Sequence, residues 1–215
     1  MCRVSEVGLV LMDRDKKIIR EIDRWRVVQG RQVKELVGFE GQRACDRRLR
    51  KLVEFGYIKR ERILYGVAGI YSNTPLGAKV AGLSGADRKI RLEQIIHDIA
   101  VLDTAIYFNK VHGVAFEDMK TEIELHRLDG FGIRKHRPDF VFTKDGKNIC
   151  VEIELTLKSK DRFVQNIYDN FMKYDTQIWI VPDMNSRITA ILNQQNEIYP
   201  NIEILTISEV EKWKI

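Results

Sequence analysis

The strongest pattern in the sequence is an alternation of apolar and polar residues over positions 149–158, and it limits what this part of the chain can form. From Ile149 to Leu157, apolar residues occupy every second position, while Glu152 and Glu154 fall on the opposite parity. Strict alternation is typical of a β-strand with one apolar and one polar face. The pattern therefore predicts a strand that carries two carboxylates on one face.

A second short strand precedes this one. Residues 140–143 are mostly apolar, and Asp145-Gly146 follows them as a dipeptide that favours a tight hairpin turn, because both residues tolerate positive φ. The hairpin would bring Asp139 close to the acidic face. Carboxylate oxygens are the ligands that Mg²⁺ and Mn²⁺ prefer. We therefore expect Asp139 and Glu152 to hold Mg²⁺, with Mn²⁺ as a substitute, in a site that activates water against a phosphodiester.

Pro138, Asp139 and Glu152 resemble the Pro-Asp…(Asp/Glu)-x-Lys signature of restriction-endonuclease-like nucleases. The resemblance implies that Asp139 and Glu152 are the metal ligands of such a site. The chain departs from the signature at its lysine, where Glu154 stands instead. This departure keeps open a nuclease-like domain with little or no activity.

The chain has no simple replacement for the signature lysine. Lys158 shares the polar face of the predicted strand, but it lies four residues beyond Glu154, which is about 13 Å at the rise of a strand. A helix predicted over residues 159–174 could supply the contact through Lys160 or Gln165. The predicted catalytic residues are Asp139, Glu152, Glu154 and Gln165.

These residues also have an ordinary structural interpretation. A Pro-Asp pair before a strand is common in turns, two glutamates on one face of a strand are often simply solvated, and Gln165 or Lys173 on a helix is more often plain surface. A strand predicted over residues 119–126 would place Glu122 and Glu124 on one face. Further carboxylates that could join a metal site are Glu93, Glu122 and Glu124, and the sequence does not choose among them.

The N-terminal part of the chain has the order helix, helix, helix, strand, strand, helix. Asp13 or Asp15 can cap the first helix, whose apolar residues recur at helical spacing up to Trp25. The other elements are predicted as helices over residues 31–37 and 42–55, strands over 57–60 and 69–72, and a helix capped by Thr74. This is the order of a winged-helix domain.

The third helix has an apolar stripe and an arginine-rich remainder. The stripe consists of Cys45, Leu49, Leu52 and Val53. A third helix of this kind places arginines in a DNA major groove, and residues 47–60 are similar to the third helix and first wing strand of winged-helix DNA-binding domains. The predicted contacts to double-stranded DNA are Arg43, Arg47, Arg48, Arg50, Lys51, Lys59, Arg60 and Arg62. A protein-interaction module is the alternative.

Charge and composition agree with a polyanion partner. The 215 residues carry a net charge of +5, and the segment from Arg14 to Arg62 holds 16 Lys and Arg against 8 Asp and Glu. The sequence has no apolar run long enough to span a membrane and no signal-peptide core. The three cysteines and four histidines lack metal-ligand spacing, so we expect the histidines to be structural or surface groups. Scattered cysteines, together with the lack of a membrane span and a signal-peptide core, predict a cytoplasmic protein.

The rest of the chain predicts a second domain. A long helix over residues 86–109, three strands, a helix and a strand over residues 177–181 follow in the order α-β-β-β-α-β, with a helix over 186–198, a strand over 202–206 and a final helix capped by Ser208. That order is the common core of the restriction-endonuclease-like fold. We therefore predict an α+β protein with a winged helix-turn-helix domain over residues 1–84 and a restriction-endonuclease-like domain with a mixed sheet over residues 85–215.

The combination of a winged helix with this second domain resembles the replication-relaxation family of bacterial plasmids, phages and integrative elements. The resemblance rests on the winged-helix segment, the helix from His97 to Asp103, Arg137-Pro-Asp139 and the segment from Glu152 to Thr156. It implies a DNA-binding accessory in plasmid replication, DNA relaxation or transfer, with replication or transfer proteins as partners.

Three hypotheses for function follow. The first is a DNA-binding protein whose second domain is nuclease-like and has little or no activity. The second is a Mg²⁺-dependent DNA endonuclease that its winged helix targets. The third is a transcriptional regulator whose C-terminal domain binds a partner or forms a homodimer.

Overall fold

The computed structural model describes residues 9–63, 65–83, 92–130, 132–133, 135–157, 159–184 and 186–214. The chain divides into two compact units, Met1–Ile99 and Ala100–Ile215, which we call the N-terminal unit and the C-terminal unit. The division falls within helix α5 (Leu92–His112). The sequence placed the boundary after residue 84, and residues 84–91, with the predicted start of the long helix, lie outside the described ranges.

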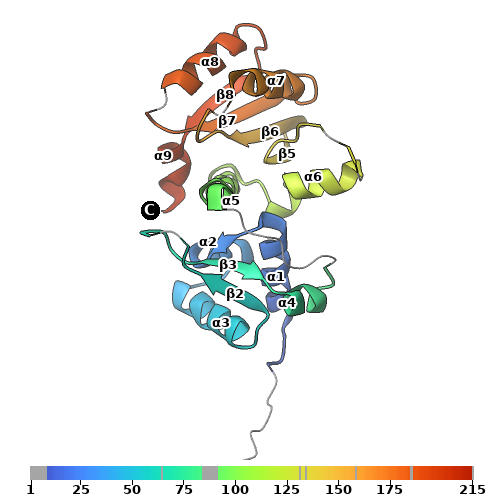
Figure 1. The fold of residues 1–215 in the computed structure, drawn as a ribbon, viewed down its shortest axis with the longest axis vertical. Coiled ribbons are helices and arrows are strands. Elements are labelled where there is room, and N and C mark those ends of the chain that lie inside the picture. Colours follow the sequence, from blue (N-terminus) through green and yellow to red (C-terminus); the bar gives the residue numbers. More distant parts are fainter. Residues whose placement is uncertain are drawn as a thin grey trace, which may run out of the picture. The chain divides into compact units, whose positions relative to one another are not determined.

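The N-terminal unit combines helices with a three-stranded antiparallel sheet in the order β1-β3-β2 (Figure 1). Its elements are α1 (Asp13–Trp25), β1 (Val28–Gln29), α2 (Gly30–Val37), α3 (Gln42–Glu54), β2 (Ile58–Glu61), β3 (Ile70–Asn73) and α4 (Pro75–Val80). The predicted succession of three helices, two strands and a capped helix is confirmed. Strand β1 was not predicted, because two residues carry no periodic pattern.

The core of this unit lies between the apolar faces of its helices and its sheet. The side chains with no exposed surface include Ile18 and Ile19 on α1 and Cys45, Leu49 and Leu52 on α3. A second cluster joins Val27, Ile70, Ile95 and Ile99. Val53, predicted within the buried stripe of α3, is only half-buried, because it lies at the edge of the apolar face.

Helix α1 is capped differently from the prediction. Met12 is the residue before the helix, and its backbone N–H donates to Asp15 Oδ2 at 2.7 Å. Asp15 is completely buried, whereas the Asp13 side chain is exposed. Asp15 therefore caps the helix from inside its first turn.

Helix α4 is held against the start of strand β2. The Thr74 hydroxyl accepts a hydrogen bond from the Gly77 N–H at 3.1 Å and donates to the Tyr57 carbonyl at 3.0 Å. A Cβ added at Gly77 would lie 1.9 Å from the Tyr57 carbonyl oxygen. Only glycine therefore allows this approach.

The C-terminal unit contains a five-stranded mixed sheet in the order β4-β5-β6-β7-β8. Strand β5 is antiparallel to both of its neighbours, β4 and β6, while β6, β7 and β8 run parallel to one another. The strands are β4 (Lys120–Thr121), β5 (Phe140–Lys144), β6 (Lys147–Ile153), β7 (Thr176–Val181) and β8 (Ile202–Thr206). The helical elements after α5 are η1 (Phe116–Asp118), α6 (Glu122–Asp129), α7 (Lys160–Phe171), α8 (Ser186–Asn196), α9 (Ile207–Val210) and η2 (Glu211–Lys214). The protein is thus a mixed α and β fold with a mixed sheet, as predicted at that level.

Helices cover both faces of the sheet (Figure 1). On one face, the Phe108 ring of α5 lies 5.2 Å from the Phe142 ring. On the other face, the Phe163 ring of α7 lies 4.9 Å from the Trp179 ring, and α8 packs against the same cluster. The sheet is therefore the middle layer of three.

Strand β6 differs from the prediction in length and in burial. The Asp145-Gly146 hairpin is confirmed, since both residues have positive φ and Lys144 pairs with Lys147. The strand ends at Ile153, however, so the alternation beyond it lies in an irregular segment. The predicted polar face is closed by α7, which leaves Glu152 only 8% exposed.

The strand predicted over residues 119–126 is wrong. Only Lys120 and Thr121 pair with β5, and α6 begins at Glu122. Thr121 N–H donates to Glu124 Oε2 at 2.8 Å, and Glu124 N–H donates back to the Thr121 hydroxyl at 3.4 Å. This Thr-x-x-Glu capping box outweighs the short alternation of Ile123 and Leu125.

Smaller differences concern helix ends and exposure. Thr206 rather than Ser208 caps α9, and α8 ends at Asn196, two residues early. The helical spacing of apolar residues predicts Ile96 on the apolar face of the long helix, but Ile96 is 45% exposed. Within the described ranges, no helix has the length and apolar character needed to cross a membrane.

Candidate nucleic-acid interface and carboxylate site

The exposed side of α3 carries two rows of residues at intervals of four. One row is Arg43, Arg47 and Lys51, and the other is Gln42, Asp46 and Arg50. All of these residues except half-buried Gln42 are exposed. The opposite side of the helix, with Cys45, Leu49 and Leu52, is fully buried. The arrangement places Arg43, Arg47, Arg50 and Lys51 on one accessible helix surface.

The second row borders a groove between α3 and the β2–β3 strands. The groove has a volume of about 410 Å³ and is lined by Asp46, Arg50, Val53, Arg60 and Tyr71. The Arg60 guanidinium carbon lies 5.9 Å from the centre of the Tyr71 ring. Burial raises the pKa of Tyr71, so the ring stays neutral beside these cations.

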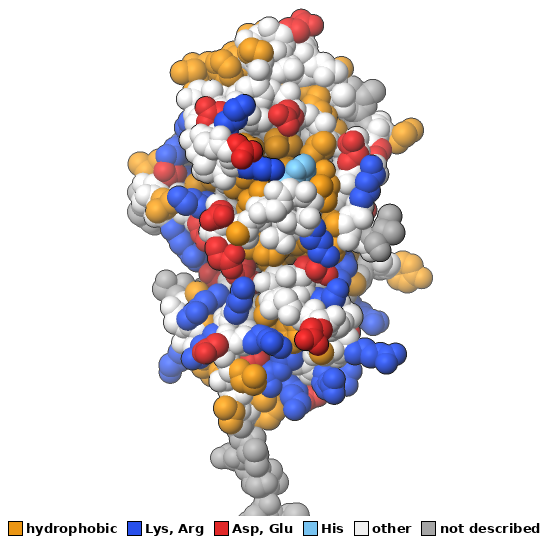
Figure 2. Space-filling model, turned by 180° about the vertical axis from the view of Figure 1, so that it is seen from behind, with side chains coloured by type: hydrophobic (Ala, Val, Ile, Leu, Met, Phe, Trp, Pro, Cys, Tyr) orange, Lys and Arg blue, Asp and Glu red, His pale blue; other side chains and the backbone are white. Residues whose placement is uncertain are grey.

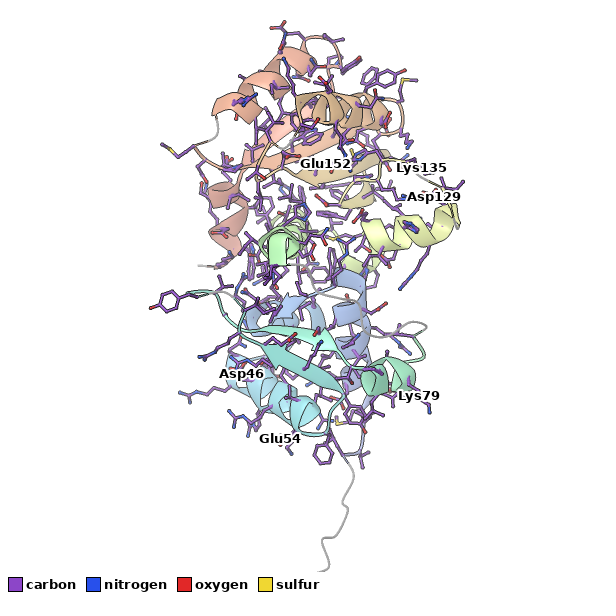
Figure 3. The ribbon with its side chains drawn as sticks, viewed as in Figure 1. Asp46, Glu54, Lys79, Asp129, Lys135 and Glu152 are labelled. Carbon is purple, nitrogen blue, oxygen red and sulfur yellow. The ribbon has the colours of Figure 1, made fainter. Side chains whose placement is uncertain are left out.

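Acidic side chains are few on this helix. Asp46 and Glu54 are the two carboxylates of α3 (Figure 3), and Asp46 Oδ1 accepts a hydrogen bond from Gln42 Nε2 at 2.8 Å. Lys and Arg side chains occupy much of the face of the N-terminal unit seen in Figure 2. The exposed arginine and lysine side chains of α3 therefore lie beside Asp46, a carboxylate that is hydrogen-bonded to Gln42.

Arg48 differs from its neighbours on α3. Its Nε donates to Asp15 Oδ1 at 2.6 Å, and its Nη2 donates to Asp15 Oδ2 and to the Val10 carbonyl. The hydrogen bond to Asp15 raises the pKa of the guanidinium further. Arg48, predicted as a DNA contact, thus ties α3 to α1 through a buried ion pair.

The remaining predicted contacts lie on or just after strand β2. Lys59 Nζ is 3.8 Å from Glu61 Oε2, so a carboxylate partly offsets its charge. Arg60 borders the groove, and Arg62 is exposed just past the strand. Among Lys59, Arg60 and Arg62, Arg60 is therefore the one that lines the groove beside α3.

In the C-terminal unit, Glu152 lies at the centre of a hydrogen-bonded group. Its Oε1 contacts His136 Nε2 at 2.5 Å and accepts from Asn170 Nδ2 of α7 at 2.8 Å. Asp139 Oδ2 accepts from the Ile153 N–H at 2.8 Å, one residue beyond Glu152. The hairpin thus brings Asp139 next to the Glu152 segment, as predicted.

Burial and charge set the protonation of this group. Burial raises the pKa of the Glu152 carboxyl, and the hydrogen bonds from His136 and Asn170 offset that rise only in part. Burial lowers the pKa of His136, but the hydrogen bond and charge of Glu152 outweigh it, so the pKa of His136 is raised. The two groups therefore titrate as a pair.

A clamp at the end of α6 holds the segment that carries His136. Arg137 Nε donates to Asp129 Oδ2 at 2.7 Å, and Arg137 also donates to the carbonyls of Ile133 and Lys135. Lys135 pairs with the other oxygen of Asp129 (Figure 3). The hydrogen bond from Lys135, together with that from Arg137, lowers the pKa of Asp129.

The hydrogen-bond partners of the Glu152 carboxylate are His136 and Asn170 rather than the other predicted catalytic residues. Glu154 follows the end of β6, where its N–H donates to the Ile180 carbonyl at 3.0 Å. Gln165 is exposed and donates to Asp169 Oδ1 at 2.9 Å. Lys160 and Lys173 are exposed as well. Lys158 and the Glu93 side chain lie outside the described residues, and Glu124 serves the α6 cap.

No metal-ligand cluster is evident in the part of the chain that the structure describes. No group of three or more His, Cys, Asp and Glu side chains is arranged there to hold an ion. Both hydrogen bonds given above for Glu152 fall on Oε1, and the Ile153 N–H bonds Asp139 Oδ2. The oxygen donors suit Mg²⁺ in kind, but a third ligand is not among the described side chains.

Sequence reasoning missed His136 and Asn170. His136 directly precedes the Arg-Pro-Asp motif, and this adjacency was the available signal. Asn170 falls on the apolar face of α7 with Phe163 and Ile167, and it is 1% exposed. A polar residue at a core position of a helix indicates a buried partner.

No protein-family model matches this chain, and no curated protein matches it in a sequence search.

Proposed function

We propose that the chain binds double-stranded DNA through its N-terminal unit, which we interpret as a winged helix with α3 as the recognition helix. The observation that carries the proposal is the surface of α3, where Arg43, Arg47, Arg50 and Lys51 are exposed opposite a fully buried back. A helix of that kind reads base edges and contacts phosphates in a major groove. Strands β2 and β3 would form the wing.

The two rows on α3 suit different contacts. The all-cationic row suits phosphates, whereas Gln42, Asp46 and Arg50 offer donors and an acceptor for base edges. A carboxylate such as Asp46 accepts from the cytosine amino group and repels phosphates. Sequence preference would therefore come mainly from the row beside the groove.

The test is binding of a labelled duplex over a salt series. Replacing Arg47 and Arg50 with alanine should weaken binding and flatten the dependence of log K on log salt by about 0.9 for each phosphate that is no longer bound. Fluorescence anisotropy measures both quantities. The matched control is alanine at Lys147 and Lys173, two exposed lysines of the C-terminal unit, which removes the same charge.

An unchanged affinity and slope in the α3 variant would remove the recognition helix from the proposal. An equal loss in the control would mean that net charge alone drives binding.

Following the resemblance to the replication-relaxation family, we propose that this DNA binding serves a bacterial mobile element. It would act in replication, relaxation or transfer, with proteins of those processes as partners.

A second candidate is a metal-dependent DNA endonuclease. The favouring observation is the β5–β6 hairpin, which brings Asp139 beside the segment of buried Glu152. These two residues would hold Mg²⁺ or Mn²⁺, which supplies water activation at a phosphodiester when bound. Glu154, where the signature has lysine, favours the inactive alternative.

Cleavage of supercoiled plasmid with Mg²⁺ or Mn²⁺ tests this candidate. Asp139→Asn and Glu152→Gln keep the size of each side chain and an acceptor oxygen, so they remove charge with little change of packing. Loss of cleavage in both variants with DNA binding intact would support the endonuclease. Absence of cleavage by the wild type on supercoiled, linear and single-stranded DNA would reject it.

The regulator alternative differs in what the C-terminal unit does. It requires that unit only for a homodimer or for a partner protein. Light scattering of the full-length chain measures the oligomeric state, and a monomer that binds DNA with full affinity would exclude a dimer as the binding form.

A further inference from the structure

A hollow on the N-terminal unit lies beside the first row of α3, apart from the groove next to β2 and β3. It has a volume of about 240 Å³, and its lining includes Arg14 of α1, Phe39 from the α2–α3 turn, and Arg47 and Lys51 of α3. Arg48 and Asp15 also line it, but they pair with each other. Residues from three separate segments therefore converge on one recess.

The recess has an excess of positive charge. Asp15 is neutralised by Arg48, which leaves Arg14, Arg47 and Lys51 without an ion pair to any residue in the described part of the chain. Three cations around one hollow repel each other, so they favour an anion between them. The charge thus points to an anionic ligand.

The side chain of Arg14 is held in place before any ligand binds. Its guanidinium carbon lies 4.9 Å from the centre of the Phe39 ring, a cation–π contact. Phe39 itself is 8% exposed, and its N–H donates to the Lys34 carbonyl at 3.0 Å after the left-handed turn at Gly38. An arginine fixed in this way loses less conformational entropy on binding.

The size of the hollow narrows the class of ligand. Its volume is below the roughly 300–1,000 Å³ of pockets that enclose a drug-sized molecule. A phosphate group is smaller and matches the planar donor fork of arginine. The fork matches a carboxylate as well, but on the proposed DNA-binding surface the anion of this size is a phosphate.

We propose that this hollow is a phosphate-binding site that takes one backbone phosphate of the duplex on α3, with Arg14, Arg47 and Lys51 as its donors. The inference rests on the proposed function for the source of that phosphate. It adds Arg14, outside the recognition helix, as a DNA contact, and it assigns Arg47 to the backbone rather than to a base. A free phosphomonoester has the same chemistry and is the other source.

The experiment compares full-length Arg14→Ala with the wild type in duplex binding between about 50 and 200 mM salt. We expect Arg14→Ala to weaken binding to every duplex sequence alike and to flatten the salt slope by about 0.9. Arg14→Lys should keep the slope and lose part of the affinity, because it keeps the charge without the fork. Lys79→Ala, an exposed cation on α4 (Figure 3), is the control and should change neither.

A second arm uses calorimetry of inorganic phosphate and of a nucleoside monophosphate without DNA. If Arg14→Ala keeps the wild-type salt slope while Arg47→Ala flattens it, the hollow is not a phosphate-binding site. The proposed function would still stand in that case. If the wild type does not bind duplex, the proposed function fails, and Arg14-dependent binding of free phosphate would then identify the other source. Binding of neither duplex nor phosphate would overturn the site.

Discussion

Arg47 and Arg48 are adjacent in sequence, but the helical rotation of about 100° per residue gives them different partners. Arg47 is exposed beside Lys51, whereas Arg48 is paired with Asp15, whose side chain is 1% exposed. One arginine is available to a ligand, and the other is part of the fold. Sequence alone counts both as positive charge on the same helix.

This difference predicts different effects of the two substitutions on stability. Arg48→Ala leaves Asp15 buried without its partner, so we expect it to lower the free energy of unfolding by about 3 kcal/mol. Arg47→Ala should change it by less than about 0.5 kcal/mol, as is usual at an exposed site. Urea denaturation measures both, and equal losses would show that the Arg48 pair has no special role.

His136 and Glu152 make stability depend on pH. The pKa of His136 is raised from 6.5 by Glu152 against the effect of burial, and burial raises the pKa of Glu152 from 4.5. In both cases the native state binds more protons than the unfolded state, so their contribution is fully present at low pH and is lost as pH rises through the raised values. We expect the free energy of unfolding to fall above pH 6.5.

The measurement is urea denaturation at about pH 6 and about pH 8.5. His136→Gln should reduce the decline between these values, and Glu152 accounts for the part that remains. The control is His112→Gln, because burial lowers the pKa of His112 below 6.5, so its contribution to stability rises with pH and does not cause a decline. An unchanged decline in His136→Gln would assign the pH dependence to other groups.

At the scale of elements, helix capping and close backbone approach determine the secondary structure of short segments more than residue periodicity does. Helix α3 was predicted because its apolar residues recur at helical spacing from Cys45 to Val53, which suffices to define a face. Helix α6 was predicted as a strand because Ile123 and Leu125 alternate, yet the Thr121–Glu124 capping box satisfies the first backbone donors of a helix there. Alternation over so few residues fits either structure.

The approach of α4 to Tyr57 gives a prediction at this scale. A methyl group in Gly77→Ala would lie 1.9 Å from the Tyr57 carbonyl oxygen, so α4 must shift. We expect a loss of about 1–3 kcal/mol in the free energy of unfolding. Gly41→Ala is the control, since its new methyl group meets nothing within 4 Å, and thermal or urea unfolding should separate the two variants clearly.

At the scale of the whole molecule, basic charge is concentrated in one unit. The segment from Arg14 to Arg62 has a net charge of +8, and the rest of the chain has −3. Ile95 and Ile99, in the first half of α5, pack with Val27 and Ile70 in the N-terminal unit. The compact N-terminal unit therefore extends into the first half of α5.

A fragment of residues 86–215 tests whether the DNA site lies in the N-terminal unit. We expect it to bind duplex far more weakly than the full-length chain at the same salt concentration, because it lacks α3 and its neighbours. Anisotropy measures binding, and circular dichroism checks that the fragment is folded. Equal affinity of a folded fragment would move the DNA site out of the N-terminal unit.

The sequence by itself determined the elements whose signal is local. Residue periodicity defined α1, α3 and α7, and the Asp145-Gly146 turn set the register that brings Asp139 beside the Glu152 segment. The composition of α3 defined its basic surface. These features follow from backbone geometry and side-chain spacing within one segment, which a single sequence records.

Only the tertiary structure decided which of these residues are accessible and what they contact. It joined His136 and Asn170 to Glu152 across 16 and 18 positions, and Arg48 to Asp15 across 33. It also closed α7 over the polar face of β6, so Glu152, which was expected on a polar strand face, is buried. Burial and long-range pairing depend on how the elements pack, and packing is a property of the whole unit rather than of any one segment.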